Sequence, residues 1–216
     1  MSDGLDADEY RNALGALITE FRRLIRDTRR VIRHSDRQER ELNALNAKLR
    51  ELATELDHKA THDSLTGAFN RRAVIERTEA HLHGHTISLI VLDIDNFKSV
   101  NDEYGHPAGD AVIVELVGRL RSAVPEHAEI GRVGGEEFTV VLRDMDLQSA
   151  VALAERMRAE VVSTPFPEPV SRTVTASFGV SQTPAGGNFS DAYGRADTAL
   201  YRAKNSGRNS VVAFAD

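Results

Sequence analysis

The feature that most constrains the fold is a heptad repeat of apolar residues over residues 14–59, with no proline in between. The a positions are Leu14, Phe21, Thr28, Ser35, Leu42, Leu49 and Leu56, and the d positions are Leu17, Leu24, Val31, Gln38, Leu45, Leu52 and Lys59. Most of these seam positions are apolar, in one unbroken register. Such a repeat predicts a left-handed coiled coil.

Two other arrangements of this segment stay open. A single helix packed on its own domain would be about 69 Å long at 1.5 Å per residue and would overhang a small domain. A helical hairpin is the other, because Ser35-Asp36-Arg37-Gln38 is the weakest part of the seam and also fits a capping box. Three isoleucines widen the apolar stripe in the first half, as in a bundle: Ile18, Ile25 and Ile32. Coil and hairpin both predict a homodimer through residues 1–60.

The pattern of residues 61–216 predicts a single domain of the α/β or α+β class, with a sheet of about five strands. The expected strands are Ile87–Asp93, Glu129–Val133, Phe138–Leu142, Val174–Val180 and Val211–Phe214. Helices are expected between them, capped at their N-termini by Asn70, Asp146 and Ser190. The loop histidines His81, His83 and His85 are expected to be solvated rather than to form a metal site.

Gly134 and Gly135 separate two strand-like runs and predict a tight β-hairpin turn, where positive φ costs little. Glu136 and Glu137 follow the turn directly. Adjacent like charges weaken a hairpin unless a positive charge lies beside them. The two acids are therefore either solvated surface residues or part of a cation site.

A second acidic stretch favours the cation site. The unbroken apolar run 87–92 is typical of a central strand covered on both faces, and it ends in Asp93-Ile94-Asp95. If this strand lies beside the hairpin, Asp93 and Glu136 can share one hard cation. Oxygen ligands in a chain without cysteine indicate Mg²⁺ or Mn²⁺ rather than Zn²⁺. Mg²⁺ held by one or two carboxylates usually completes its shell with phosphates, which points to a nucleotide.

The segment Gly134-Gly135-Glu136-Glu137-Phe138 resembles the signature of the GGDEF-domain diguanylate cyclase family, in a GGEEF variant. Further matches follow in the family's order: Asp63-Ser64-Leu65-Thr66-Gly67, Asn70-Arg71-Arg72, Asp93-Ile94-Asp95-Asn96-Phe97-Lys98, Asn101-Asp102, Gly105-His106, Gly109-Asp110, Ala196-Asp197, Ala199-Leu200-Tyr201, Ala203-Lys204 and Gly207-Arg208-Asn209. The resemblance implies a sheet like that of nucleotidyl cyclases and polymerase palms. It also implies an enzyme that condenses two GTP into cyclic di-GMP and two pyrophosphates.

The resemblance also implies the roles of individual residues. Asp93, Glu136 and the backbone carbonyl of Ile94 would bind the metal, and Glu137 would be a second-metal ligand or would assist the base. The implied substrate contacts are Asn96, Phe97, Lys98, Lys204 and Arg208 for phosphates, Asn101 and Asp110 for guanine, and Gly134 and Gly135 in the turn. Asp110 is expected in the first turn of a helix, where an acid is also favoured by the helix dipole.

The reaction needs two domains facing each other across a two-fold axis, since one domain binds one GTP. The N-terminal coil would raise the local concentration of the partner site. Many relatives carry Arg-x-x-Asp with the arginine nine residues before the first signature glycine, as a site of product inhibition. Here those positions hold Pro125-Glu126-His127-Ala128, so weak or absent inhibition is expected.

Composition limits the classes of partner that we expect this protein to bind. The net charge is −6 and no broad basic face for nucleic acid is expected. The apolar runs are far shorter than a membrane span, and the polar first ten residues do not fit a signal peptide. We therefore expect a cytoplasmic protein. Two other function classes stay open, namely an inactive receptor for GTP or cyclic di-GMP and a purely structural coiled-coil protein.

Overall fold

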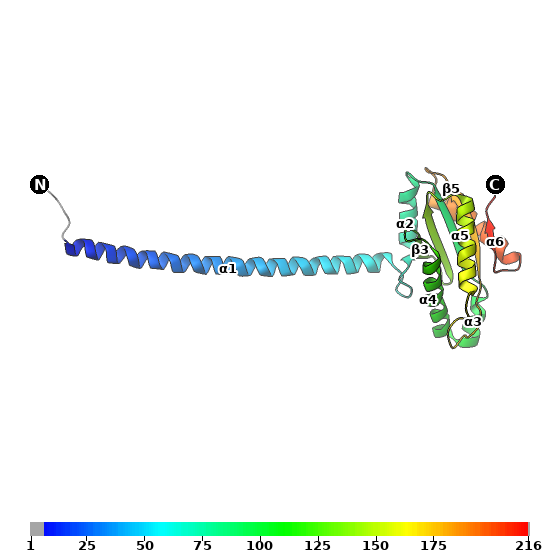
Figure 1. Cartoon of the computed structure of the whole chain (residues 1–216), viewed down its shortest axis with the longest axis horizontal. Coiled ribbons are helices and arrows are strands. Elements are labelled where there is room, and N and C mark those ends of the chain that lie inside the picture. The colour runs from blue at the N-terminus through cyan, green and yellow to red at the C-terminus, as the bar shows by residue number, and fades with distance from the viewer. Residues whose placement is uncertain (1–6, 216) are drawn as a thin grey trace. The chain divides into compact units, whose positions relative to one another are not determined.

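The computed structural model describes residues 7–215, with the backbone alone for residues 35 and 36 (Figure 1). The chain divides into two units, and the boundary falls between Asp57 and His58. The first unit is helical, and the second combines a sheet with helices. No helix among the described residues is long and apolar enough to cross a membrane.

One helix, α1, runs from Ala7 to Thr61 without interruption. The break near Ser35 that a helical hairpin requires is therefore not formed, because the capping-box residues lie inside the helix; the side chain of Ser35 itself is outside the described part. The ten apolar seam residues from Leu14 to Leu56 have exposed fractions between 42% and 68%. The apolar residues of the seam, before and after its polar centre, are thus left in contact with solvent by the single chain.

The second unit contains a six-stranded mixed sheet in the order β1-β3-β4-β2-β5-β6. The strands are β1 (Phe69–Asn70), β2 (Ile87–Ile94), β3 (Glu129–Arg132), β4 (Glu137–Arg143), β5 (Ala176–Thr183) and β6 (Val211–Ala213). The four inner strands pair antiparallel, while β1 runs parallel to β3 and β6 parallel to β5. The prediction of about five strands missed β1, because two residues are too short to show a period.

Helices cover both faces of this sheet (Figure 1). They are α2 (Arg71–Leu82), α3 (Phe97–Tyr104), α4 (His106–Ala123), α5 (Leu147–Val162) and α6 (Phe189–Asn205). In β2, Ile90 and Leu92 pack in the core formed with α3, α4 and α5, whereas Leu89 and Val91 pack in the core formed with α2 and α6. Every residue of β2 is buried, which confirms the prediction of a central strand covered on both faces.

The caps predicted at Asn70 and Asp146 are formed, and their side chains accept hydrogen bonds from Ala73 and Ser149 backbone N–H groups. The predicted cap at Ser190 is wrong. Helix α6 begins earlier because Asn188, a residue that caps as well as serine, accepts from the backbone N–H of Asp191 at 2.9 Å. The predicted strand Val174–Val180 is also shifted, since β5 starts at Ala176 and continues to Thr183.

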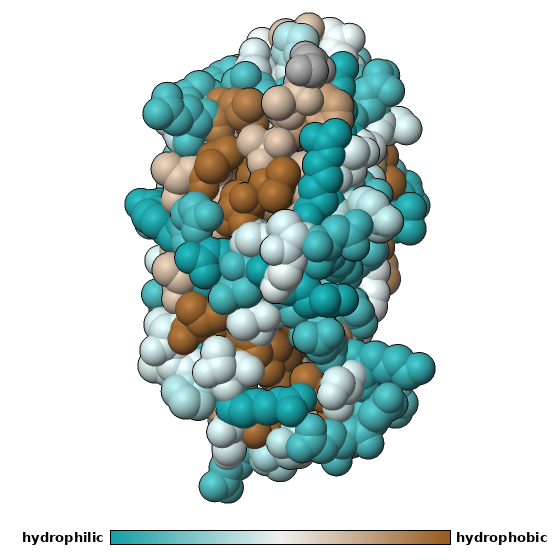
Figure 2. Space-filling view, turned by 90° about the vertical axis from the view of Figure 1, so that its right-hand side faces the viewer, coloured by the Kyte–Doolittle hydropathy of each residue, from teal (hydrophilic) through white to brown (hydrophobic). Residues whose placement is uncertain are grey.

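The surface of the second unit differs from the seam of α1. Among its described residues, Val114 and Tyr201 are the large hydrophobic side chains that are exposed. Figure 2 shows one face on which hydrophobic patches are separated and bordered by hydrophilic residues. The second unit therefore buries its own apolar residues, and its fold places the ends of β2 and of the β3–β4 hairpin at one rim of the sheet.

Candidate active site

The acidic residues meet where β2 ends beside the β3–β4 hairpin. Asp93 is the direct partner of Glu137 in the antiparallel register of β2 and β4. The backbone N–H of Ile94 donates to the carbonyl of Glu136 at 3.3 Å. Glu136 lies in the turn and Glu137 begins β4. The structure thus brings together the two acidic stretches that lie about forty residues apart in sequence.

The glycines of the turn have a different role from the one expected. Neither Gly134 nor Gly135 has a φ between +20° and +160°, so the turn does not use the left-handed conformations that glycine permits. A Cβ on Gly134 would instead lie 2.5 Å from Oε2 of Glu137. Around Gly135, a Cβ would meet nothing within 4 Å. Gly134 therefore makes room for a carboxylate, and Gly135 leaves the backbone of the turn open to a ligand.

Burial and mutual repulsion make the negative charge at this rim costly. Burial raises the pKa of Asp93, an effect that Lys204 opposes and Asp95 increases. Burial also raises the pKa of Glu136, and the charge of Asp93 raises it further. Lys204 Nζ lies 2.8 Å from Oδ1 of Asp93, whose residue is only 4% exposed. One ammonium group thus faces several carboxylates, and additional positive charge at this rim would stabilise them.

The residues present fit a divalent cation of the Mg²⁺ type. Within residues 7–215 there is no group of three or more His, Asp or Glu side chains arranged around a metal position. Asp93 and Glu136 instead offer two carboxylates, and Ile94, which follows Asp93, carries a backbone carbonyl at the same end of β2. That donor set suits Mg²⁺, which keeps open positions for phosphates, and does not suit a site enclosed by protein ligands alone.

The expected phosphate contacts lie at the start of α3 and at or just beyond the end of α6. Asn96 is the N-cap of α3 with φ of 56°, and Phe97 is the first residue of that helix. Lys98 is exposed, and Lys204 lies in the last turn of α6. Arg208, three residues beyond α6, has φ of 64°. The N-terminus of α3 thus offers backbone N–H groups to an anion. Of the three cations, Lys204 contacts Asp93 directly, and Arg208 precedes Asn209, whose backbone N–H donates to Asp95.

The expected guanine contacts lie where α3 and α4 pack together. A Cβ on Gly109 of α4 would lie 2.0 Å from Oδ1 of Asn101 in α3, so Asn101 lies against the start of α4. Asp110 is the next residue of α4. The prediction that Asp110 lies in the first helical turn is wrong, because α4 already begins at His106, directly after Gly105. The helix dipole therefore gives a weaker reason for an acid at this position.

Asp95 is a structural residue whose role was missed from the sequence. It is buried and accepts hydrogen bonds from Oγ1 of Thr175 and Oγ of Ser177, both at 2.7 Å. It also accepts from the backbone N–H of Asn209 at 2.9 Å, directly after Arg208. Asp95 thus fixes the segment after α6 to the end of β2. No spacing in the sequence distinguishes it from Asp93.

Residues 60–210 match the protein family described as "Diguanylate cyclase, GGDEF domain". This chain belongs to the GGDEF family. Diguanylate cyclase VdcA of Vibrio cholerae is 36% identical over 204 residues, which cover 91% of this chain and 60% of VdcA. The chain therefore spans less than two thirds of that relative.

Solved structures of GGDEF proteins also include a long helix before the domain. The coiled coil and GGDEF domain of DgcB from Caulobacter crescentus, in complex with c-di-GMP, has a TM-score of 0.76 at 30% identity; the match covers 82% of this chain and 98% of that chain. Diguanylate cyclase SiaD from Pseudomonas aeruginosa, in complex with its activator SiaC, has a TM-score of 0.70 at 35% identity and covers 94% of this chain and 78% of that chain.

Proposed function

We propose that this GGDEF protein is a diguanylate cyclase that condenses two GTP molecules into cyclic di-GMP and two pyrophosphates. The observation that carries the proposal is the meeting of buried Asp93 and half-buried Glu136 at the rim, with Lys204 beside Asp93, in a chain of this family. An array of crowded carboxylates next to exposed cations suits the binding of a metal nucleotide. The two GTP molecules bind to two protomers, one to each.

In this proposal Asp93, Glu136 and the carbonyl of Ile94 hold Mg²⁺ or Mn²⁺. When bound, the cation neutralises charge that develops on the phosphates and polarises the reacting phosphoryl group. Glu137 lies next to this set, where Gly134 leaves space for its carboxylate. It assists removal of the proton from the attacking hydroxyl or supplies a ligand to a second cation.

The remaining residues bind and orient GTP. Lys98, Lys204 and Arg208 contact the β- and γ-phosphates, together with the backbone N–H groups at the start of α3. Lys204 has to leave Asp93 for a phosphate when the cation arrives. Asn101 and Asp110 contact guanine, whose N1–H and amino group both donate to a carboxylate. Gly134 and Gly135 let the substrate approach the turn closely.

The chemical step joins the sugar of one nucleotide to the α-phosphate of the other. The 3′-oxygen of one GTP bonds to the α-phosphorus of the other, and the bond from that phosphorus to the bridging oxygen breaks. The hydroxyl proton is lost and pyrophosphate leaves. A second reaction of the same kind, in which the two nucleotides exchange roles, closes the ring and releases the second pyrophosphate. Residues 61–216 carry this chemistry in the proposal.

Residues 1–60 supply the dimer that the reaction needs. The seam of α1 is apolar and exposed, and a second copy of the helix would cover it in a coiled coil. Tethering two domains raises their effective concentration for one another. Signals received by this segment would act by changing how the two domains meet.

The test is to incubate the full chain with Mg²⁺ and an equimolar mixture of GTP and ATP, and to separate the nucleotides by chromatography. We expect cyclic di-GMP as the main product and little use of ATP, because adenine leaves the carboxylate of Asp110 without its donors. GTP binding without product would indicate an inactive receptor instead. The absence of both GTP binding and product would indicate a structural protein.

A further inference from the structure

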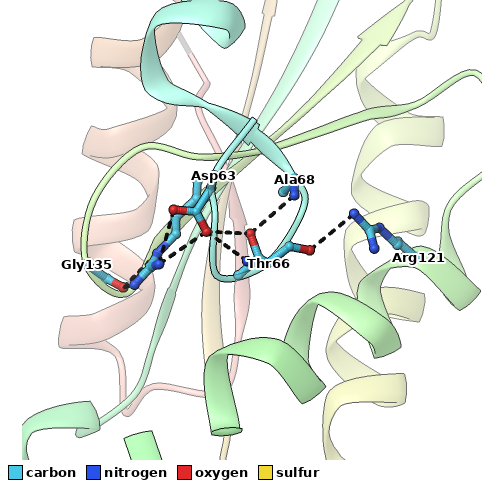
Figure 3. Close-up of polar contacts among 6 residues, drawn as sticks. Asp63, Thr66, Ala68, Arg121 and Gly135 are labelled. Carbon is cyan, nitrogen blue, oxygen red and sulfur yellow. Dashed lines mark hydrogen bonds and ion pairs between the residues drawn. The ribbon is translucent and has the colours of Figure 1, made fainter. Parts of the chain in front are cut away.

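The loop that follows α1 closes around a single carboxylate, that of Asp63 (Figure 3). Oδ1 of Asp63 accepts hydrogen bonds from the backbone N–H of Thr66 at 3.0 Å and from its hydroxyl at 2.7 Å. The backbone of Asp63 pairs with Ala68 and Gly67, at 2.8 and 2.9 Å. Because α1 ends at Thr61, Asp63 has a fixed place two residues beyond the helix.

Arg132 joins this loop to the signature turn. It is the last residue of β3, and its Nη1 lies 3.2 Å and 3.3 Å from the two oxygens of Asp63. Its Nε and Nη2 donate to the carbonyl of Gly135, at 3.2 and 2.7 Å. The side chains of Arg132 and Asp63 are 16% and 22% exposed, so water screens their ion pair only in part.

The signature turn has few other restraints. Its backbone bonds are those from the N–H groups of Val133 and Gly134 to the carbonyl of Glu137, at 3.0 and 3.3 Å, and the one from the N–H of Ile94 to the carbonyl of Glu136, at 3.3 Å. Gly135 has no side chain that could pack, and glycine has the greatest backbone freedom to lose. Glu136 comes directly after it. A donor that holds the carbonyl of Gly135 therefore fixes the peptide that carries Glu136.

We propose that Arg132 is a positioning residue for Glu136, and that Asp63 fixes Arg132, so that the loop after α1 helps to set the geometry of the metal site. The catalytic part of this inference rests on the proposed function. The planar guanidinium suits the task because it can contact a carboxylate and a carbonyl at once. Arg132 touches neither substrate nor metal in this role and acts through the turn.

The charge of Asp63 supports the same assignment. Burial alone would raise the pKa of Asp63, but the hydrogen bonds from Thr66 and the charge of Arg132 outweigh it and hold the pKa below its usual value. Asp63 is therefore ionised at neutral pH and presents a full negative charge to the guanidinium.

Arg121 provides a matched control. Its Nη2 donates to the carbonyl of Gly67 at 2.7 Å and lies 3.4 Å from the carbonyl of Thr66, in the same loop (Figure 3). The described contacts of Arg121 do not include the signature turn. Arg121→Met therefore removes support from the loop alone, whereas Arg132→Met removes support from both the loop and the turn.

The first measurement is the initial rate of the full chain against GTP and Mg²⁺, with the melting temperature of each variant. We expect Arg132→Met to lower kcat by about ten- to a hundredfold and to raise the Mg²⁺ concentration for half-maximal rate, with KM for GTP little changed. Arg121→Met should lower the melting temperature yet keep kcat within about twofold. Equal kcat losses in both variants, or a wild-type kcat in Arg132→Met, would overturn the proposal.

Asp63→Asn tests the link to the loop. It should lower kcat less than Arg132→Met, and the double variant should be no slower than Arg132→Met alone, because Asp63 acts through Arg132. Independent, multiplying losses would show that Asp63 does not act in this way. Asp63→Asn also keeps the inference testable if Arg132→Met fails to fold.

Hydrogen exchange separates this inference from the proposed function, because it needs no activity. The amides of Val133 and Gly134 should exchange faster in Arg132→Met than in wild type, and should be unchanged in Arg121→Met. Unchanged exchange in Arg132→Met refutes the positioning role even in an active enzyme. A wild-type chain that makes no cyclic di-GMP refutes the proposed function, and the exchange rates then decide on the turn alone.

Discussion

The helix α1 and the domain that follows it obtain their stability in opposite ways. In the domain, the apolar side chains of β2 are fully enclosed by helices on both sides. In α1, the apolar seam is exposed, and ion pairs join near neighbours such as Arg37 and Glu41 at 2.8 Å. Exposed pairs of this kind contribute about 0.3–0.5 kcal/mol each. The domain thus buries its apolar residues within itself, while the helix leaves its seam uncovered.

The largest expected effect comes from a substitution that abolishes activity in the domain and leaves the folds of the domain and of α1 intact. Glu136→Gln should lower the initial rate about a thousandfold or more, since a lost metal ligand costs several kcal/mol. Its melting temperature should not fall, because the raised pKa of Glu136 shows that its charge is disfavoured in the folded state. The control is Glu79→Gln, an exposed acid of α2. Wild-type activity in Glu136→Gln would refute the metal-ligand role.

Two leucines offer the next largest contrast. Leu92→Ala, in the fully buried β2, should destabilise the domain by about 2–5 kcal/mol because it leaves a cavity. Leu49→Ala, at a 55% exposed seam position, should leave the unfolding midpoint of the domain unchanged and weaken the dimer. Calorimetry and analytical ultracentrifugation measure the two effects. Equal losses of domain stability would break the comparison.

Deleting residues 1–56 removes the helix and keeps the domain. At sub-micromolar enzyme, specific activity should fall about a hundredfold, because the effective concentration supplied by the tether is lost. Raising the enzyme concentration should restore part of the activity, and the domain should melt at its former temperature. A monomeric truncated chain that equals the full chain at high dilution would contradict this.

A smaller effect concerns acid stability at the loop after α1. A carboxylate with a lowered folded pKa stabilises the fold above its unfolded pKa, and this stabilisation is lost as pH falls through the folded value. For Asp63, whose ordinary value is 3.8, the loss should occur below about pH 4. Melting temperatures of wild type and Asp63→Asn should therefore differ at pH 7 and converge only as the pH falls well below 3.8. A difference that persists in acid would rule out the ionised carboxylate as the cause.

The smallest expected effect is that of the product. Pro125, Glu126, His127 and Ala128 offer no guanidinium to bind guanine or phosphate at two points. Added cyclic di-GMP at low micromolar concentration should barely change the initial rate at saturating GTP. Strong inhibition that GTP does not relieve, and that is lost on mutating residues 125–128, would show that this segment binds product.

The sequence predicted those features that depend on period and pairing. The central position of β2 and the meeting of Asp93 with the hairpin followed from an unbroken apolar run and two acidic ends. The role of Gly134 could not be predicted in this way, because it depends on where the carboxylate of Glu137 lies in space. The contacts of Arg132 with Asp63 and Gly135 join residues that no local pattern connects. The cap of α6 was misplaced because Asn188 and Ser190 are both good caps.

Asp93 and Asp95 are two residues apart, but selection would treat them differently. Asp95 has both oxygens engaged by Thr175, Ser177 and Asn209, so changing it would loosen the domain whatever the domain does. Asp93 lies in an environment that raises its pKa and so disfavours its charge, and its loss would remove the proposed metal ligand and leave the architecture. A lineage that kept nucleotide binding but gave up synthesis would have an easy route through Asp93. In a saturation library, Asp95 should tolerate few substitutions under any screen for folding, and Asp93 few only under a screen for product.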